Sequence, residues 1–297
     1  MNVFSHNPGQ LSDWCGGQWS RPPEAPFRGC SIDSRQIQPG ELFVALPGEK
    51  ADGHAYLDAA RARGDAGAIV RRGTPDAGWP LLYVDDPRRA LRDVARGHRS
   101  RLTGRIVAVT GSSGKTSVKE LLANMLATAG PTARTRGNWN NDLGMPLSLL
   151  TMTPEDRFGV FEVGMNHPGE LDPLCAILRP HLSVVTNVGP VHIEHFDSEA
   201  AIAREKAAVL RALPADGVAV LPLDDRWYAQ LRSEWNGAVR AVSLSEDADY
   251  RIRVGDGPVF TVTEKSTGES EVLESPLPGR HVLSNCGLAI AVARAFG

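Results

Sequence analysis

Gly111-Ser112-Ser113-Gly114-Lys115-Thr116 lies between an apolar run at residues 106–110 and an amphipathic segment at about 117–129. The apolar run predicts a buried strand, and the helical spacing of apolar residues in the later segment predicts a helix. A glycine turn between a strand and a helix can direct backbone N–H groups onto a phosphate, and the helix N-terminus adds partial positive charge. Lys115 can then reach the outer phosphates, while the Thr116 hydroxyl can ligate Mg²⁺. This stretch therefore predicts a site for a nucleoside triphosphate.

The loop is shorter than the usual phosphate-binding pattern. That pattern is G-x-x-x-x-G-K-[ST], and its first glycine would fall at Val109 in this chain. A Gly-Lys-Thr triplet also occurs by chance in turns. The strand expected before the loop and the helix expected after it favour phosphate binding over a chance match.

Composition bounds the class of protein. The chain has 297 residues, 42% hydrophobic and 23% charged, with a formal net charge of -3. This is an ordinary globular composition, long enough for two domains, and the near-neutral charge gives no support for nucleic-acid binding. No apolar run is long enough for a membrane-spanning helix, and residues 1–10 lack the apolar core of a secretory signal. The four cysteines lie far apart without a C-x-x-C pair, so we expect a cytoplasmic protein with neither a zinc site nor a disulfide framework.

The pattern of apolar runs predicts two α/β units with a boundary after Leu102, giving domains of residues 1–102 and 103–297. In the first unit, expected strands alternate with expected helices. The strands are expected at 42–46, 68–70 and 81–84, and the helices at about 54–63 and 88–99. Residues 101–104 form the expected linker.

The second unit shows the same alternation, which predicts a mostly parallel sheet with helices on both faces. Its strands are expected at 106–110, 158–163, 182–186 and 218–221, and its helices at about 117–129, 169–178, 198–213 and 226–234. Short segments at 238–244, 250–254, 259–263 and 271–273 then predict a small antiparallel β addition. A last helix is expected at about 282–295.

Polar side chains follow two of the expected strands, at the edge where such sheets bind ligands. Glu162 ends the otherwise apolar strand at 158–163. A carboxylate there, beside a phosphate loop, is a natural Mg²⁺ ligand, and the alternative is a surface carboxylate. His192 follows Gly189-Pro190, but a lone loop histidine is more often structural or solvated than a ligand.

Two further features allow more than one interpretation. Lys206 lies four residues after Ile202 and three before Val209, on the apolar face of its expected helix. The pattern alone favours a lysine whose stem packs while its ammonium reaches water. The asparagine-rich turn at 137–146 either bonds its own backbone or holds phosphate or substrate.

Four motifs occur along the second unit in a fixed order. They are T-G-S-S-G-K-T-S-V-K-E-L-L from Thr110, G-N-W-N-N-D-L-G-M-P-L-S-L-L from Gly137, E-V-G-M-N-H-P-G-E-L from Glu162 and T-N-V-G-P-V-H-I-E-H-F from Thr186. In order and spacing they resemble the Mur ligases, most closely the branch that adds D-alanyl-D-alanine to UDP-N-acetylmuramoyl-tripeptide. S-I-D-S-R at 31–35, G-E-L-F-V-A-L-P-G at 40–48 and D-G-H at 52–54 resemble the family's uridine-nucleotide-binding domain. P-G-R-H at 278–281, followed by Asn285, resembles its adenine-contacting segment, so the resemblance covers roughly residue 29 to the C-terminus.

The resemblance implies a role for each matching residue. For ATP binding it implies Gly111, Ser112, Ser113, Gly114, Lys115, Thr116, Ser117, Asn138, His281 and Asn285. For the UDP-linked substrate it implies Ser31, Asp33, Ser34, Arg35, Asn140 and Asn141. For two Mg²⁺ ions it implies Thr116, Glu162, His192 and a carbamylated Lys206, and for catalysis Lys115, Lys206 and His192. A carbamate is an oxygen ligand for a hard cation, which reverses the interpretation that the pattern alone favours for Lys206.

The implied reaction belongs to peptidoglycan synthesis and hence to cell-wall growth, cell shape and division. ATP phosphorylates the terminal carboxylate of UDP-N-acetylmuramoyl-tripeptide, and the amine of D-alanyl-D-alanine then attacks the acyl phosphate. Lys115 and two Mg²⁺ ions would neutralise charge during the phosphoryl transfer. We expect a monomer in the cytoplasm.

Two departures from the family pattern leave other functions open. The family has a third domain that binds the incoming amino component, and the sequence stops where that domain should begin, as in a fragment or a truncated homologue. Val282 stands where an asparagine is expected. The alternatives are a sibling Mur ligase adding another amino acid, which Ser112-Ser113 and residues 138–146 disfavour, and a non-catalytic binder of nucleotide or muropeptide. Residues 1–27 carry no pattern from which we predict a structure or a role.

Overall fold

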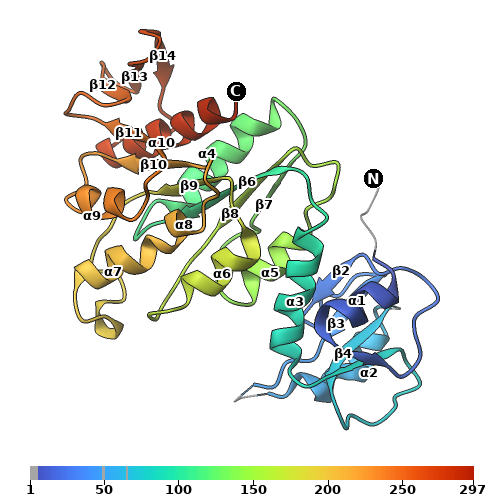
Figure 1. Ribbon diagram of the computed structural model, residues 1–297. Helices are drawn as coiled ribbons and strands as arrows, with labels where there is room; N and C mark the ends of the chain where they lie inside the picture. The colour runs from blue at the N-terminus through green and yellow to red at the C-terminus, as the bar shows by residue number, and fades with distance from the viewer. Residues whose placement is uncertain (1–5, 49–50, 65) are drawn as a thin grey trace. The chain divides into compact units, whose positions relative to one another are not determined.

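The computed structural model describes residues 6–48, 51–64 and 66–297 and divides into two compact units (Figure 1). The first unit comprises Met1–Thr103 and Pro146–Pro154, and the second comprises Gly104–Met145 and Glu155–Gly297. The expected boundary after Leu102 lies one residue from the division in the structure. The sequence pattern predicts that all residues after Leu102 belong to the second unit, whereas Pro146–Pro154 belong to the first unit in the structure.

The first unit is built on a sheet of order β1-β5-β4-β3-β2 in the described residues, parallel except for β1. Its strands are β1 (Gln18–Trp19), β2 (Gly29–Ser31), β3 (Glu41–Val44), β4 (Gly67–Arg71) and β5 (Leu81–Val84). Its helices are α1 (Pro8–Cys15), the 3-10 helix η1 (Gly53–Tyr56), α2 (Leu57–Arg61) and α3 (Pro87–Arg99). Alternate residues of a strand point to opposite faces, so Phe43 and Ala45 share one buried cluster with Leu57 of α2. The strands and helices expected for this unit are confirmed within a few residues.

The N-terminal segment, for which we made no prediction, belongs to the first unit from residue 6 onward, and residues 1–5 lie outside the described residues. Asn7 and Gln10 form a reciprocal capping box that starts α1, with Pro8 at the first helical position. Trp14 of α1 lies so close to Gly97 of α3 that a Cβ there would meet its ring at 2.1 Å. Helix α1 therefore packs against α3 through a contact that only glycine permits.

The second unit contains a sheet of order β14-β13-β12-β11-β10-β9-β6-β8-β7. Its strands are β6 (Arg105–Thr110), β7 (Thr132–Arg134), β8 (Phe158–Glu162), β9 (Leu182–Val185), β10 (Val218–Pro222), β11 (Ala238–Ser243), β12 (Tyr250–Val254), β13 (Val259–Glu264) and β14 (Ser270–Glu274). Its helices are α4 (Lys115–Ala127), α6 (Leu171–Leu178), the 3-10 helix η2 (Ile193–His195), α7 (Glu199–Lys206), α8 (Ala208–Arg211), α9 (Tyr228–Ser233) and α10 (Arg280–Phe296), while α5 (Gly144–Leu149) spans the division between units. The mostly parallel sheet expected from the alternation of strands and helices is confirmed.

Helices cover both faces of this sheet, as the sequence predicts. Helices α4 and α10 lie side by side on one face, where they share a core with Val107 and Val109 of β6 (Figure 1). Helices α6 and α8 contact β6 and supply the opposite layer. Strand β6 is buried on both faces, as a central parallel strand is. The loop that follows β6 lies at the carboxyl edge of the sheet, where ligands bind in such folds.

Three details differ from the expected pattern. Strand β11 pairs in parallel with both β10 and β12, so the antiparallel addition comprises only the pairings among β12, β13 and β14. The helix expected at 198–213 is two helices, α7 and α8, that meet at Ala207. Strand β7 and helix α5 were not predicted, because three residues at a sheet edge and six after a polar turn are too short to show a period.

No helix among the described residues has the length and apolar character needed to cross a membrane.

Candidate nucleotide and metal site

The phosphate loop joins β6 to α4 through two glycines with left-handed or mirror-extended backbones. Gly111 has φ 152° and Gly114 has φ 77°. A Cβ at Gly111 would lie 1.8 Å from Thr186 Oγ1, and one at Gly114 would lie 2.7 Å from Asn285 Oδ1. Both positions therefore need glycine for the backbone and for space. The loop is thus fitted tightly against the end of β9 on one side and α10 on the other.

The two serines of the loop bind the segment that follows β9. Ser113 N donates to Asn187 Oδ1 at 2.9 Å, and Asn187 Nδ2 donates to Ser113 Oγ at 2.7 Å. Ser112 Oγ accepts from Gly189 N at 2.8 Å. These bonds fix the loop before any ligand binds, so the serine side chains are engaged with the protein itself.

Lys115 folds back over the loop. Its Nζ donates to Gly111 O at 2.9 Å, and burial lowers its pKa, opposed by the nearby carboxylate of Glu162. An ammonium against the backbone of a glycine loop is placed to contact a phosphate oxygen. Ser117 lies two residues further on, in the first turn of α4.

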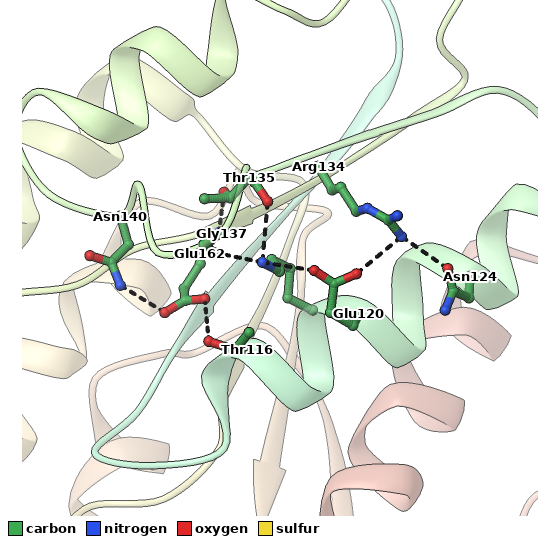
Figure 2. Close-up of polar contacts among 9 residues, drawn as sticks. Thr116, Glu120, Asn124, Arg134, Thr135, Gly137, Asn140 and Glu162 are labelled. Carbon is green, nitrogen blue, oxygen red and sulfur yellow. Dashed lines mark hydrogen bonds and ion pairs between the residues drawn. The ribbon is translucent and has the colours of Figure 1, made fainter. Parts of the chain in front are cut away.

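Glu162 is the centre of a small polar cluster (Figure 2). Its carboxylate accepts from Thr116 Oγ1 at 3.0 Å and from Asn140 Nδ2 at 2.7 Å, and only 2% of the residue is exposed. The interpretation as a surface carboxylate is therefore wrong. A buried carboxylate and a hydroxyl are hard oxygen donors, the set with which Mg²⁺ is bound by one or two protein ligands and substrate phosphates. The donor set of Thr116 and Glu162 fits Mg²⁺.

A cavity of about 300 Å³ lies beside this cluster. It brings together seven of the residues predicted for the site: Gly111, Lys115, Asn138, Asn140, Asn141, His192 and Lys206. It is also lined by residues that were not predicted: Gly164, Met165, Asn166, Glu170 and Val191. Sequence motifs that are far apart in the chain thus converge on one polar cavity at the carboxyl edge of the sheet.

Lys206 is buried at the wall of this cavity. Only 3% of the residue is exposed, and its Nζ has no hydrogen-bond or ion-pair partner within the described part of the chain. Burial, reinforced by Lys115 and opposed by Glu205, lowers the pKa of Lys206 to about 7. The inward position expected from the helical spacing is confirmed, and the side chain lines the cavity.

His192 lines the same cavity in an unusual backbone conformation. It is one of two non-glycine residues with positive φ in the described chain, at φ 61° and ψ 26°. Such a conformation costs free energy for a residue with a Cβ and commonly accompanies a functional position. An imidazole and an amine at one wall fit a hard cation only poorly, whereas a carbamate on Lys206 would supply the oxygen that such a cation prefers.

Residues 109–293 match the Mur ligase middle domain, and residues 26–99 match the model described as Mur ligase family, catalytic domain. The chain belongs to the Mur ligase family. The resemblance carried by the four motifs is therefore confirmed.

Relatives of this Mur ligase chain are longer than it is. UDP-N-acetylmuramoyl-tripeptide--D-alanyl-D-alanine ligase of Escherichia coli (strain K12) is 37% identical over 294 residues, covering 97% of this chain and 64% of that protein. The ligase of the same name from Haemophilus influenzae is 34% identical and covers 90% of this chain and 59% of its own length. The chain thus spans less than two thirds of these relatives.

Solved structures agree with the fold of this Mur ligase chain. MurF from Acinetobacter baumannii has a TM-score of 0.92 and 32% identity, covering 100% of this chain and 66% of that one. The MurF ligase from Thermotoga maritima in complex with ADP has a TM-score of 0.79 and 26% identity, covering 91% and 63% of the two chains.

The segment expected at the adenine lies at the start of α10. His281 is exposed in the first turn of the helix, while Asn285, one turn later, is 7% exposed and abuts Gly114 of the phosphate loop. Val282, where the family pattern has asparagine, is buried in the core shared with α4. Asn285 is thus the residue of this segment that the structure brings to the phosphate loop.

The residues expected at the uridine nucleotide lie in the first unit. Arg35 donates twice to the Asp33 carboxylate, from Nε at 2.9 Å and from Nη2 at 2.8 Å, which lowers the pKa of Asp33 to about 2. Ser31 Oγ accepts from Asp33 N, and Ser34 is buried in the same turn. Ser31 ends β2 and the other residues form the turn after it, in the first unit, whereas Asn140 and Asn141 belong to the second unit.

The D-G-H motif has a structural basis in the same unit. His54 Nε2 accepts from Arg71 N at 3.0 Å, so its Nδ1, at 2.6 Å from Asp52 Oδ1, is the donor of that pair. A Cβ at Gly53 would lie 2.7 Å from Leu46 N. The motif joins β3 to β4 through its own hydrogen bonds.

Besides the unpredicted residues that line the cavity, two residues around Glu162 were not predicted. Thr135 Oγ1 accepts from Glu162 N at 2.9 Å, and Lys119 Nζ donates to Thr135 O at 3.1 Å. Thr135 follows a strand of three residues, and Lys119 sits among apolar residues of α4. Neither position has a sequence pattern that predicts these contacts, because the hydrogen bonds are made with backbone atoms.

Proposed function

We propose that this chain supplies the substrate- and ATP-binding parts of a cytoplasmic ligase that joins D-alanyl-D-alanine to UDP-N-acetylmuramoyl-tripeptide in peptidoglycan synthesis. One observation carries the proposal: Lys115, Lys206 and His192 line a single polar cavity beside the Thr116–Glu162 pair. The names of the relatives and the ADP complex of a structural neighbour support the choice of reaction and of nucleotide.

The ATP phosphates are assigned to the loop between β6 and α4. Backbone N–H groups at 111–117 and the N-terminus of α4 would bind them, with Lys115 releasing Gly111 O to meet a phosphate oxygen. Asn138 would contact the phosphates from the asparagine loop. His281 and Asn285 at the start of α10 are assigned to the adenosine.

Two Mg²⁺ ions are assigned, one beside the cavity and one at its wall. Thr116 and Glu162 would hold one, and His192 with a carbamate on Lys206 would hold the other. Bound Mg²⁺ supplies charge neutralisation for phosphoryl transfer. The lowered pKa of Lys206 supports the carbamate, because only a neutral amine reacts with carbon dioxide.

The remaining residues bind and position the peptide substrate. Ser31, Asp33, Ser34 and Arg35 of the domain at 1–102 are assigned to the uridine diphosphate, and Asn140 and Asn141 of the domain at 103–297 to the muramoyl-peptide end. The terminal carboxylate then attacks the γ-phosphorus of ATP, ADP leaves, and the amine of D-alanyl-D-alanine displaces phosphate from the acyl phosphate. Lys115 neutralises charge on the transferred group. We propose a monomer, since each assigned site is built from one chain.

The test is a pair of binding measurements on the chain and its Lys115→Ala variant. A charge-assisted hydrogen bond contributes roughly 1.5–3 kcal/mol, so the ADP affinity in Mg²⁺ falls by roughly 10- to 100-fold. The affinity for uridine diphosphate stays unchanged, because Lys115 lies in the other unit. Lys265→Ala, which removes an exposed ion pair to Asp247, serves as the control and changes neither affinity. Equal loss of both affinities in a folded Lys115→Ala protein would refute the assignment.

A further inference from the structure

Lys119 is a completely buried lysine outside the predicted site. It lies on α4 one turn after Lys115, with 0% of the residue exposed. Its Nζ donates to Thr135 O at 3.1 Å and to Gly137 O at 2.9 Å, and lies 3.0 Å from Glu120 Oε1. An ammonium carries three donors, and here each one has an acceptor. The burial of this charge is therefore matched by a complete set of partners.

The two carbonyls belong to the segment that leads into the asparagine loop. Thr135 is also bonded on its other sides, since its N donates to Val160 O at 3.1 Å and its Oγ1 accepts from Glu162 N at 2.9 Å. Gly137 turns the chain with φ 50°. Three residues later Asn140 Nδ2 donates to the Glu162 carboxylate at 2.7 Å. Lys119 thus binds a segment that contacts Glu162 at both ends.

Helix α4 reaches Glu162 by two routes (Figure 2). Thr116 contacts the carboxylate directly, and Lys119 contacts it indirectly through the backbone of residues 135–137. The two residues are three positions apart on one helix, so their separation is fixed by helix geometry. A shift of residues 135–140 away from α4 would therefore move Glu162 and Asn140 relative to Thr116.

We infer that Lys119 is a positioning residue for the Mg²⁺ site: it fixes residues 135–140 against α4 so that Thr116 and Glu162 present their oxygens to one cation. The inference rests on the proposed function, which assigns that cation to Thr116 and Glu162. Groups that orient a metal ligand typically affect metal affinity by about 10- to 100-fold when they are removed. Lys119 does so without touching nucleotide or metal.

The outer part of the same network provides a matched control. Glu120 also pairs with Arg134 at 3.1 Å, and Arg134 Nη1 donates to Asn124 Oδ1 at 2.9 Å. Both side chains of the Glu120–Arg134 pair are close to half exposed. Arg134 is thus a cation of the same network that contacts neither Thr135 nor Gly137 through its side chain. Its loss removes a surface ion pair and leaves the segment held.

The experiment measures ADP affinity by calorimetry at increasing Mg²⁺ concentration for the native chain and three variants. Lys119→Met keeps the length and apolar stem of the side chain and is expected to weaken Mg²⁺ binding by about 10- to 100-fold. Its ADP affinity without Mg²⁺ is expected to stay native. Arg134→Met should match the native chain at all Mg²⁺ concentrations, and Glu162→Gln should lose the enhancement by Mg²⁺ altogether.

The outcomes separate this inference from the proposed function. A folded Lys119→Met chain with native Mg²⁺ dependence overturns the inference alone, as does equal weakening of ADP with and without Mg²⁺, which a merely structural residue would cause. An undiminished Mg²⁺ effect in Glu162→Gln, or none in the native chain, overturns the proposed metal site itself. If Lys119→Met does not fold, Lys119→Gln decides, since its side chain is one atom shorter and cannot hold both carbonyls. Native Mg²⁺ affinity in Lys119→Gln then overturns the inference, and a loss supports it.

Discussion

The two units bury basic side chains in different ways. The first unit buries a histidine pair, in which His6 Nε2 lies 2.7 Å from His98 Nδ1 and His98 Nε2 lies 2.9 Å from Met152 O. Burial lowers the pKa of His6 to about 3 and that of His98 to about 4, so both are neutral at pH 7. The second unit buries two lysines close to its polar cavity. The first unit therefore buries these two histidines uncharged, whereas the second buries two amines, one of them at the wall of its polar cavity.

Within the second unit the two lysines differ again. Lys119 has three acceptors for its three donors, whereas Lys206 has none among the described residues. A satisfied buried charge stabilises one arrangement of the chain. A buried amine without partners is unfavourable, which points to a ligand that it binds or to a covalent modification. Hydrogen-bond satisfaction thus distinguishes the two residues, although both are lysines on inward helix faces.

Acidification tests the first side of this comparison and has the largest expected effect. The folded pKa of His98, about 4, lies below the ordinary value of 6.5, so between these values the unfolded state binds more protons. Stability of the first unit is therefore complete above pH 6.5 and falls toward pH 4, by about 3 kcal/mol from His98 alone. Hydrogen exchange of the α3 amides at pH 7, 5 and 4 measures this fall. His98→Gln, which cannot titrate, should reduce the dependence to the part that His6 causes, and an unchanged slope in that variant would show that His98 does not contribute.

Much of the fold and of the site could be predicted from the chain itself. The phosphate loop follows from a strand, a glycine turn and a helix, and Glu162 from a polar residue that ends an apolar strand. The spacing of Ile202, Lys206 and Val209 predicted that Lys206 faces inward, and it does. Each of these features is formed by residues that are close together in the chain, so its pattern is visible in the sequence.

Other features depend on where the chain returns. The direction of β11 is set by its neighbours, since a strand has the same pattern whether its pairing is parallel or antiparallel. Lys119 resembles any helical lysine until the carbonyls of Thr135 and Gly137 come to lie against it. The capping box of Asn7 and Gln10 could have been seen, but the short helix that follows shows no clear period. Backbone acceptors and strand directions leave no sequence signal.

Truncation of each lysine tests the second side of the comparison, with a smaller effect on stability. Lys119→Met leaves the buried Thr135 carbonyl without its donor, which costs roughly 1–3 kcal/mol in the free energy of unfolding. Lys206→Met removes an amine that has no partner and replaces it with an apolar side chain of similar length, so stability stays equal or rises. Urea unfolding of both variants at pH 7 measures the difference. A larger loss in Lys206→Met than in Lys119→Met would reverse the roles that hydrogen-bond satisfaction assigns to the two residues.

Carbamylation distinguishes the lysines chemically and needs no large change in stability. Carbon dioxide adds to a neutral amine, and the pKa of Lys206, about 7, leaves a substantial neutral fraction at neutral pH. The nearby Lys115 ammonium would stabilise the resulting carbamate anion. In ¹³C-bicarbonate with Mg²⁺ and ADP, the chain should show one carbamate carbon resonance that Lys206→Met abolishes and Lys119→Met retains. A resonance that survives in Lys206→Met, or its absence from the native chain, would show that Lys206 is not the carbamylated residue.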